Sequence, residues 1–343
     1  MTPSELSPLA NLEIVRISIA LCTYNGARFL GAQLESIALQ TRLPDELIVC
    51  DDCSTDGTLE LVEKFAAKAP FRVSFSKNEV QLGVTKNFER AISKCTGDII
   101  FLCDQDDYWL PEKLSRVALP LALDERIGLV FSNAMVTDSV LNQFGYTMWE
   151  TVGLNTKRRL KLNSDKALSV LIRRCVVTGA TLAFRSNLRE HIVPIPSACF
   201  HDAWIACVAA ARSRIVVIDM PLIMYRQHDA NVIGGKRIGY FSKVTQAINA
   251  SPIWFDIEIS RSIDLMKRLR IIDDNRVEEK YLNELNEKIL HLQNRRGIFS
   301  CNIFGRLFLV MSELFSLRYF KFSEGLGAAF VDLFLRKKLR RFL

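Results

Sequence analysis

Four short apolar runs, separated by amphipathic helical patterns, dominate the first third of the chain. The runs lie at residues 17–22, 47–50, 71–75 and 99–103. Between the first two runs, Leu30, Leu34 and Ile37 recur at the spacing of one helix face, and similar patterns separate the later runs. Strands that alternate with helices form a mainly parallel sheet, flanked by helices and joined by right-handed crossovers. The alternation therefore predicts an α/β, Rossmann-like fold.

Acidic residues follow two of these runs. Asp51 and Asp52 follow the second run, and Asp104, Asp106 and Asp107 follow the fourth. Like charges this close disfavour each other's ionised forms, so water, basic side chains or a bound cation must compensate them. A helix N-cap just downstream would need a single Asp. Ligands bind such sheets beyond the carboxyl ends of the strands, and Mg²⁺ or Mn²⁺ binds carboxylates together with phosphate oxygens. A metal–phosphate site is therefore favoured over a solvated loop.

The predicted chemistry follows from such a cation. The segment after the first run, CTYNGARF, has no G-x-G-x-x-G, so a dinucleotide held in the usual Rossmann manner is not expected. A metal at a diphosphate would neutralise a departing nucleotide diphosphate, and an incoming hydroxyl would need a general base. The motif His201-Asp202-Ala203-Trp204 offers a carboxylate for that task. A helix N-cap is the alternative role for Asp202.

Cysteine usage and charge narrow the class of protein. Nine cysteines are scattered without a pairing pattern, and no apolar leader precedes them, which is typical of a reduced, cytoplasmic protein. Cys50 and Cys53 form a single C-x-x-C, which is weak support for a redox or zinc site. The net charge of +7 is only mildly basic, and no nucleic-acid partner is expected. The sequence has no run of about 18 uncharged apolar residues, so no membrane-spanning helix is predicted.

The character of the chain changes after residue 235. Residues 125–235 mix polar loops with short strand candidates at 128–132 and 215–218, whereas residues 257–294 are predicted as one long helix. From residue 298 the chain is rich in Phe and Leu and carries eight basic against three acidic residues. Aromatic and basic helices can lie in a lipid headgroup layer, so peripheral membrane contact is one interpretation. Packing against the rest of the chain, or an oligomer interface, is the other.

Several motifs in order resemble family 2 glycosyltransferases of the GT-A fold. They are CTYNGARFLGAQLESIALQT, IVCDDCSTDGT, LGVTKNFERAI, GDIIFLCDQDDYWLPEK, HDAW and YRQHDANVIGG. The DQDDxW, HDxW and YRQHxxNxxG elements are most similar to the subgroup described as rhamnosyltransferases of bacterial O-antigen and capsule synthesis. The resemblance predicts an N-terminal tail over residues 1–14, a GT-A catalytic domain over 15–235 and a helical C-terminal extension over 236–343.

The resemblance also implies roles for individual residues. The nucleotide and donor sugar would contact Thr23, Tyr24, Asn25, Asp51, Asp52, Lys86, Asn87, Asp104 and Asp107. A divalent metal, Mg²⁺ or Mn²⁺, would be held by Asp106, Asp104 and His228. Asp202 would be the catalytic base of an inverting displacement, and Trp204 would flank the acceptor. Cys53 stands where the family usually has Gly, so a positive φ there would be mildly strained.

The implied activity is transfer of a sugar from a nucleotide-diphosphate donor to a hydroxyl of a lipid-linked bacterial surface glycan, at the inner face of the cell membrane. L-rhamnose from dTDP-rhamnose is the leading donor, with UDP-hexoses and UDP-N-acetylhexosamines as alternatives. A nucleotidyltransferase and a non-catalytic glycan-binding protein remain competing functions. The C-terminal helices could also support oligomerisation.

Overall fold

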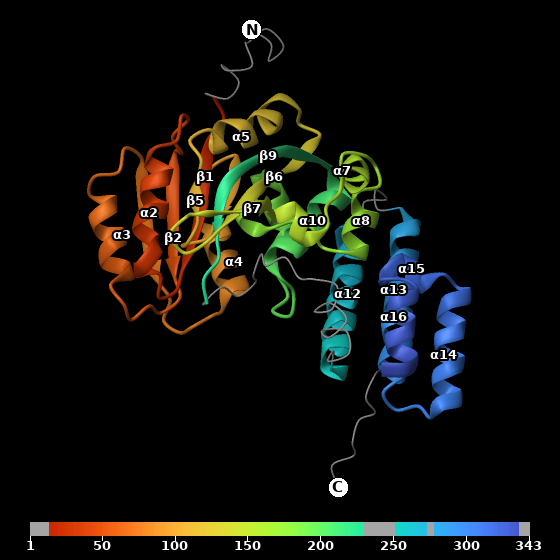
Figure 1. The fold of residues 1–343 in the computed structure, drawn as a ribbon. Helices are drawn as coiled ribbons and strands as arrows, with labels where there is room; N and C mark the ends of the chain where they lie inside the picture. Colours follow the sequence, from red (N-terminus) through yellow and green to blue (C-terminus); the bar gives the residue numbers. More distant parts are fainter. Residues whose placement is uncertain (1–13, 230–250, 273–277, 336–343) are drawn as a thin grey trace. The chain divides into compact units, whose positions relative to one another are not determined.

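The computed structural model describes residues 14–229, 251–272 and 278–335 (Figure 1). The chain divides into two compact units. The first unit comprises Met1–Leu168 and Val176–Lys236, and the second comprises Ser169–Cys175 and Arg237–Leu343. Residues 169–175, which the sequence analysis gave to the catalytic domain, therefore group with the C-terminal part.

A single mixed sheet forms the centre of the first unit. In the described part of the chain its order is β3-β2-β1-β4-β8-β6-β9-β5, with β7 paired to β6. The strands are β1 (Ile17–Thr23), β2 (Glu46–Asp51), β3 (Arg72–Lys77), β4 (Ile99–Cys103), β5 (Tyr108–Trp109), β6 (Ile127–Thr137), β7 (Gln143–Thr147), β8 (Leu182–Arg185) and β9 (Arg214–Arg226). All four N-terminal apolar runs are strands, and the predicted α/β fold is confirmed.

Strands pair in parallel in the N-terminal region, where strands and helices alternate along the sequence. Beyond that region, parallel and antiparallel pairs are mixed. β3, β2, β1 and β4 are parallel neighbours. β8 is antiparallel to both β4 and β6, whereas β6 and β9 are again parallel. The candidates at 128–132 and 215–218 extend into β6 and β9, which are longer than expected because their downstream parts also pair with each other.

Helices cover the faces of the sheet, as Figure 1 shows for α2 and α4. The helices of this unit are α2 (Ala27–Ala38), α3 (Thr58–Ala66), α4 (Val84–Lys94), α5 (Lys113–Leu123), α6 (Met148–Val152), α7 (Thr156–Leu162), α9 (Arg189–Ile192) and α10 (His201–Arg212), with the 3₁₀ turn η2 (Gly179–Thr181) before β8. Leu30, Leu34 and Ile37 of α2 are buried in the same core as β1 and β4. Burying each such side chain contributes about 1.5–3 kcal/mol, which fixes the helix on the sheet.

The second unit is helical. It contains the end of α8 (Ala167–Arg173), α12 (Pro252–Ile272), α13 (Glu279–Gly297), α14 (Ile303–Phe315), α15 (Arg318–Phe322), α16 (Leu326–Phe330) and the π-helical turn η4 (Val331–Leu335). The prediction of one helix over 257–294 is wrong: α12 ends at Ile272 and α13 begins at Glu279. Glu278, just before α13, has φ −58° and ψ 133°, which is not helical, so one helix cannot pass through this position. Arg296 near the end of α13 pairs with Asp256 near the start of α12, so the two helices run antiparallel.

Candidate functional site

The carboxyl ends of three parallel strands meet at one edge of the sheet. β1 lies between β2 and β4, so the loops that follow these strands are neighbours. The loop after β1 begins at Tyr24, the loop after β2 contains Asp52, and the loop after β4 contains Asp104. The topology therefore gathers the acidic residues of two separate sequence clusters at the edge where such sheets bind ligands.

The carboxylates after β4 are incompletely neutralised. Burial, then the charges of Asp106 and Asp202, raises the pKa of Asp104 to about 7. Asp107 is almost fully buried, and burial with the nearby Asp106 and Asp104 raises its pKa well above the usual range. Its Oδ2 has no hydrogen-bond partner among the described residues. This loop holds negative charge that an additional cation would stabilise.

Lys113 and Arg226 are the basic side chains that offset the charge of this loop, and Lys113 was not identified from the sequence. It is fully buried, its Nζ donates to Ala180 O at 2.7 Å, and it lies 3.3 Å from the centre of the Trp109 ring. Burial lowers its pKa to about 7, although Cys103 and Asp107 act in the opposite direction. A lysine at the first position of α5 opposes the helix dipole, and that unfavourable placement was the available signal.

Asp106 and His228 meet across the site. Asp106 Oδ2 lies 2.8 Å from His228 Nε2, although 122 residues separate them in sequence. The His228 ring packs on Phe29 at 4.7 Å, and the Arg226 side chain donates to the Asp106 carbonyl at 2.7 Å. The end of β9 therefore holds both the acidic loop and the histidine in place.

The predicted three-residue metal set is only partly assembled. Within residues 14–229, 251–272 and 278–335, no group of three or more His, Cys, Asp or Glu is arranged to hold a metal ion. Asp104 therefore does not complete a preformed site with Asp106 and His228. Two protein ligands still fit Mg²⁺ or Mn²⁺, because these ions keep positions for phosphate oxygens and water. The uncompensated carboxylates of the loop are consistent with that fit.

The remaining acidic residue of the loop has a different role from the predicted one. Asp107 was expected to face the donor sugar or metal, but it is 1% exposed and its Oδ1 accepts a hydrogen bond from the Arg226 backbone at 3.1 Å. The cause is a long-range pairing: the next residue, Tyr108, pairs with Met224 of β9, and this places Asp107 beside the Arg226 backbone. It ties the acidic loop to β9.

Asp202 lies in the first turn of α10, as a candidate base. Its Oδ2 accepts from the Gly179 backbone N–H at 3.2 Å and its Oδ1 from the Ala203 N–H at 2.7 Å. It is close enough to Asp104 to raise the pKa of that carboxyl. Asp202 of the HDAW motif and Asp104 of the acidic loop therefore lie near each other.

Gly179 and His201 form the support behind Asp202. The His201 ring stacks on Phe88 at 4.1 Å, and its Nε2 has no hydrogen-bond partner in the described part of the chain. A Cβ on Gly179 would lie 2.8 Å from that nitrogen. Only a glycine allows the backbone N–H to approach Asp202 while the imidazole occupies this space. No sequence pattern indicated this pairing.

Trp204 does not flank an open site. Its side chain is 3% exposed, and its Nε1 donates to Ile192 O at 2.8 Å. Residues two apart on a helix point about 200° from each other, so a side chain at 204 faces the interior when Asp202 faces the site. The predicted acceptor role of Trp204 is therefore replaced by a role in packing α10.

Several residues predicted to contact the nucleotide are instead used in the protein interior. Asp51 is fully buried and accepts hydrogen bonds from Thr23 Oγ1 and from the Ser54 backbone, each at 2.8 Å. Thr23 is itself buried. Tyr24 is exposed, whereas Asn25 accepts from the Thr55 N–H through its side chain. Thr23 and Asp51 therefore shape the loops, whereas Tyr24 and Asn25 are the exposed residues of these four.

The second part of the predicted nucleotide set holds the loop before α4. The Asp52 carboxylate accepts from the Leu82 and Gly83 backbone at 2.7 and 2.8 Å. Asn87 is buried and donates to Cys50 O at 2.8 Å. These bonds explain why the two side chains are turned inward, against the expectation of direct nucleotide contact. Lys86 pairs with Glu89 on the same helix at 2.8 Å.

A left-handed residue and a close side-chain contact shape these loops. Cys53 has φ 69°, the left-handed conformation expected from its place in the motif, and its thiol donates to Asn78 O at 3.2 Å. Gln105 joins the acidic loop to the turn after β1: its Oε1 accepts from Tyr24 N, and a Cβ on Gly26 would lie 2.1 Å from that oxygen. Gln105 and Gly26 were not identified from the sequence.

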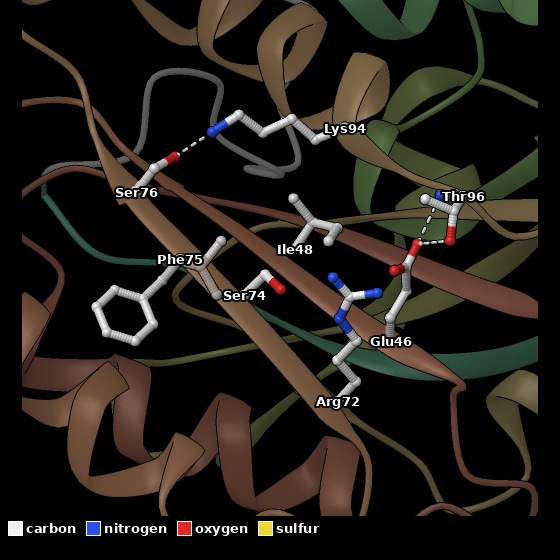
Figure 2. Close-up of a pocket in the computed structure, with 9 residues that line it drawn as sticks. Glu46, Ile48, Arg72, Ser74, Phe75, Ser76, Lys94 and Thr96 are labelled. Carbon is white, nitrogen blue, oxygen red and sulfur yellow. Dashed lines mark hydrogen bonds between the residues drawn. The ribbon is translucent and has the colours of Figure 1, made fainter.

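A separate pocket lies on β2 and β3. Its volume is about 200 Å³, and its lining includes Glu46, Arg72, Ser76 and Lys94 (Figure 2). Glu46 accepts hydrogen bonds from Thr96, and Lys94 donates to Ser76, as the dashed lines show. None of the acidic residues after β4 lines it, so this pocket is not the candidate site.

Comparison with known proteins identifies the family. Residues 18–179 match the model described as "Glycosyl transferase family 2". These residues, just under half of the chain, form a domain of this family. The match covers β1 to β4, the acidic loop and Gly179, which are the parts of the site that the strand topology brings together.

Curated relatives extend the similarity beyond the family model. A dTDP-rhamnosyl transferase RfbG of Shigella flexneri is 29% identical over 252 residues, which cover 67% of this chain and 84% of that protein. An uncharacterized glycosyltransferase of Nostoc is 26% identical over 63% of this chain and 66% of its own length. The abequosyltransferase RfbV of Salmonella typhimurium is 27% identical over about half of each chain.

Solved structures support the fold. S. aureus TarS matches with a TM-score of 0.58 at 18% identity, over 92% of this chain and 55% of TarS. A TarS fragment, residues 1–349, in complex with UDP-GlcNAc matches with a TM-score of 0.55 at 17% identity, over 92% of this chain and 90% of the fragment. At this level of identity the likeness concerns the fold alone.

Proposed function

We propose that this family 2 glycosyltransferase moves a sugar from a nucleotide-diphosphate donor to an acceptor hydroxyl with inversion at the anomeric carbon. The observation that carries the proposal is the proximity of Asp202 to Asp104. This proximity places a candidate base next to the loop that would bind the diphosphate. In an inverting displacement the hydroxyl attacks opposite the leaving group, so base and leaving-group sites must lie at one centre.

Asp202 is the proposed base. Its two carboxylate oxygens accept hydrogen bonds from Gly179 and Ala203, which orient the group and leave lone pairs for an acceptor hydroxyl. Asp202 takes the hydroxyl proton as the new glycosidic bond forms and the bond to the diphosphate breaks. A general base of this kind contributes a factor of ~10²–10⁴ in rate.

Asp106 and His228 are the proposed metal ligands. A divalent ion, Mg²⁺ or Mn²⁺, would neutralise the charge that develops on the leaving diphosphate. Arg226 fixes the backbone of Asp106, and Phe29 supports the His228 ring, so both ligands are held before the donor arrives. Asp104, beside them, would contact the ribose or the donor sugar.

The proposed donor is dTDP-L-rhamnose, and the proposed acceptor is a lipid-linked bacterial surface glycan. The similarity to the Shigella dTDP-rhamnosyl transferase supports this choice over a UDP-hexose or a UDP-N-acetylhexosamine. The test is release of nucleotide diphosphate from a panel of nucleotide sugars, with Mn²⁺, Mg²⁺ or EDTA. Turnover of dTDP-rhamnose alone is expected. Faster turnover of a UDP-sugar would overturn the donor, and no turnover of any donor with a range of acceptors would overturn the activity.

A further inference from the structure

The outward face of α14 is mostly apolar, with exposed Ser312 at its edge. Phe304, Phe308 and Phe315 are 79%, 73% and 80% exposed. At 100° per residue, the exposed apolar side chains fall within an arc of about 140° around the helix. They are Ile303, Phe304, Leu307, Phe308, Met311 and Phe315. Contiguous exposed apolar surface on this scale marks an interaction site.

The inward face of the same helix is charged. The two ionisable residues in the α14 sequence are Arg306 and Glu313, and both are buried. Glu313 accepts from Asn294 at 2.7 Å and contacts His291 at 2.6 Å, so its charge is satisfied inside the bundle. A helix on a water-exposed surface shows the reverse pattern, with its charges outward. The arrangement fits a helix whose outer side lies against an apolar phase.

Exposed apolar side chains continue along the second unit. Phe320 on α15, Phe330 on α16 and Phe334 in η4 are each more than half exposed. The basic residues among them are used internally: Arg318 pairs with Glu313, and Lys321 pairs with Glu287 at 2.6 Å. Ion pairs within the unit therefore offset the charges of two of the eight basic residues that follow residue 298.

The sequence after the last described helix decides between two occupants of this face. Residues 336–343, RKKLRRFL, contain five basic and no acidic residues; their structure lies outside the described part. A dimer through the α14 face would bring two copies of this strongly positive segment into one assembly, where like charges repel. An anionic lipid surface attracts the same segment.

We propose that the α14 face docks in the plane of an anionic lipid bilayer, at the boundary between headgroups and acyl chains. The helix is about 20 Å long at 1.5 Å per residue, too short for a hydrocarbon core of about 30 Å, so it lies along the surface. Among the described helices, none is long and apolar enough to cross a membrane. The inference deepens the proposed function by naming where a lipid-linked acceptor is met, but binding is measured without activity.

The test is co-sedimentation of the full chain with vesicles of phosphatidylcholine alone or mixed with phosphatidylglycerol. Strong binding to the anionic vesicles, weakened by salt, is expected. The double variant Phe304→Ser, Phe308→Ser should bind at least tenfold less. The control Phe75→Ser, Phe144→Ser changes two exposed phenylalanines of the first unit and should bind as the unaltered chain does. Circular dichroism and the melting temperature establish that each variant is folded.

A further variant separates the contribution of the C-terminal basic residues to vesicle binding from that of the apolar α14 face. Replacing Lys337, Lys338, Arg340 and Arg341 by Gln should reduce binding to the anionic vesicles and remove its salt dependence. The proposal is overturned if the full chain does not co-sediment with anionic vesicles. It is equally overturned if the variant Phe304→Ser, Phe308→Ser binds as well as the control. It is also overturned if light scattering finds a dimer that Phe304→Ser, Phe308→Ser dissociates while vesicle binding is absent. Nucleotide release with a soluble acceptor should be unchanged in all these variants, so failure of docking and failure of the activity are distinguishable.

Discussion

The two units of the chain both bury ionisable side chains, but they neutralise them to different extents. In the first unit, the loop after β4 places Asp104, Asp106 and Asp107 together, and the pKa of Asp104 is raised to about 7 by burial and by its acidic neighbours. In the second unit, burial would raise the pKa of Glu313, but hydrogen bonds from His291 and Asn294 lower it below its usual value.

The difference separates a ligand site from a structural network. In the second unit the buried carboxylates Glu313 and Asp332 are compensated: Arg295 pairs with Asp332 at 2.6 Å, and Tyr319 donates to the same carboxylate. The acidic loop has Arg226 and the weakly basic Lys113 as counter-charges, but one Asp107 oxygen has no partner among the described residues. A buried charge cluster that its own protein leaves unbalanced is a candidate for binding a ligand, whereas a balanced one contributes to folding.

The largest effect is expected from Asp202→Asn. The amide cannot accept the proton of the acceptor hydroxyl, so kcat should fall by a factor of ~10²–10⁴, with the KM for the donor unchanged. Steady-state kinetics with a confirmed acceptor measure this. Asp219→Asn, at an exposed carboxylate on β9, is the control and should be near normal. Near-normal turnover of Asp202→Asn would transfer the role of base to another group, His201 first.

Asp106→Ala should lower kcat by ~10²–10³-fold, because the charge developing on the leaving diphosphate loses its partner. Removing this carboxylate should also lower the pKa of Asp104, since Asp106 is one of the charges that raise it. Kinetics and Mn²⁺ titration calorimetry test the first effect, and NMR titration of the Asp104 carboxyl tests the second. Unchanged activity of the unaltered enzyme in EDTA would contradict a metal at this site.

Glu313→Ala tests the second unit, where the buried carboxylate is compensated by hydrogen bonds and opposite charges. It leaves His291, Asn294 and Arg318 without a shared acceptor, and we expect a loss of about 3 kcal/mol in the free energy of unfolding of the second unit. Urea unfolding at pH 7 measures it. Because the folded state depresses the pKa of Glu313, its contribution is present above pH 4.5 and disappears as the pH falls through the folded value.

The matched change Glu324→Ala, at an exposed carboxylate of the same unit, should alter the free energy of unfolding by less than about 1 kcal/mol. If the two variants have the same free energy of unfolding, the Glu313 network does not stabilise the unit. The contrast drawn between the two regions would then be wrong for the second unit.

The smallest effect is expected from Gly179→Ala. The new methyl group would lie 2.8 Å from His201 Nε2, so the backbone that holds Asp202 must shift and kcat should fall about tenfold. The double variant Gly179→Ala, His201→Ala removes the clash and should recover most of the loss. Gly31→Ala, where a Cβ meets nothing within 4 Å, is the control. A Gly179→Ala enzyme with normal kcat would show that this support does not position the base.

The sequence predicted what depends on local patterns. Alternating apolar runs and helix faces are encoded within a few residues, and the run at 99–103 matches β4, Ile99–Cys103, at both ends. The acidic clusters were correctly expected at strand ends, because apolar runs that stop at carboxylates mark where buried strands leave the sheet. The positive φ of Cys53 likewise followed from its place in the motif.

Tertiary structure alone decided which side chains face the site. Asp51, Asp107 and Trp204 carry the right chemistry in the right motifs, but partners far along the chain turn them inward. Lys113 and Gly179 matter through contacts with Ala180 and His201 that no spacing rule predicts. The inverted α14, with its charges inside, has the same origin. A residue's direction is fixed by long-range hydrogen bonds and packing, whose free energies depend on which elements meet and not on the local sequence.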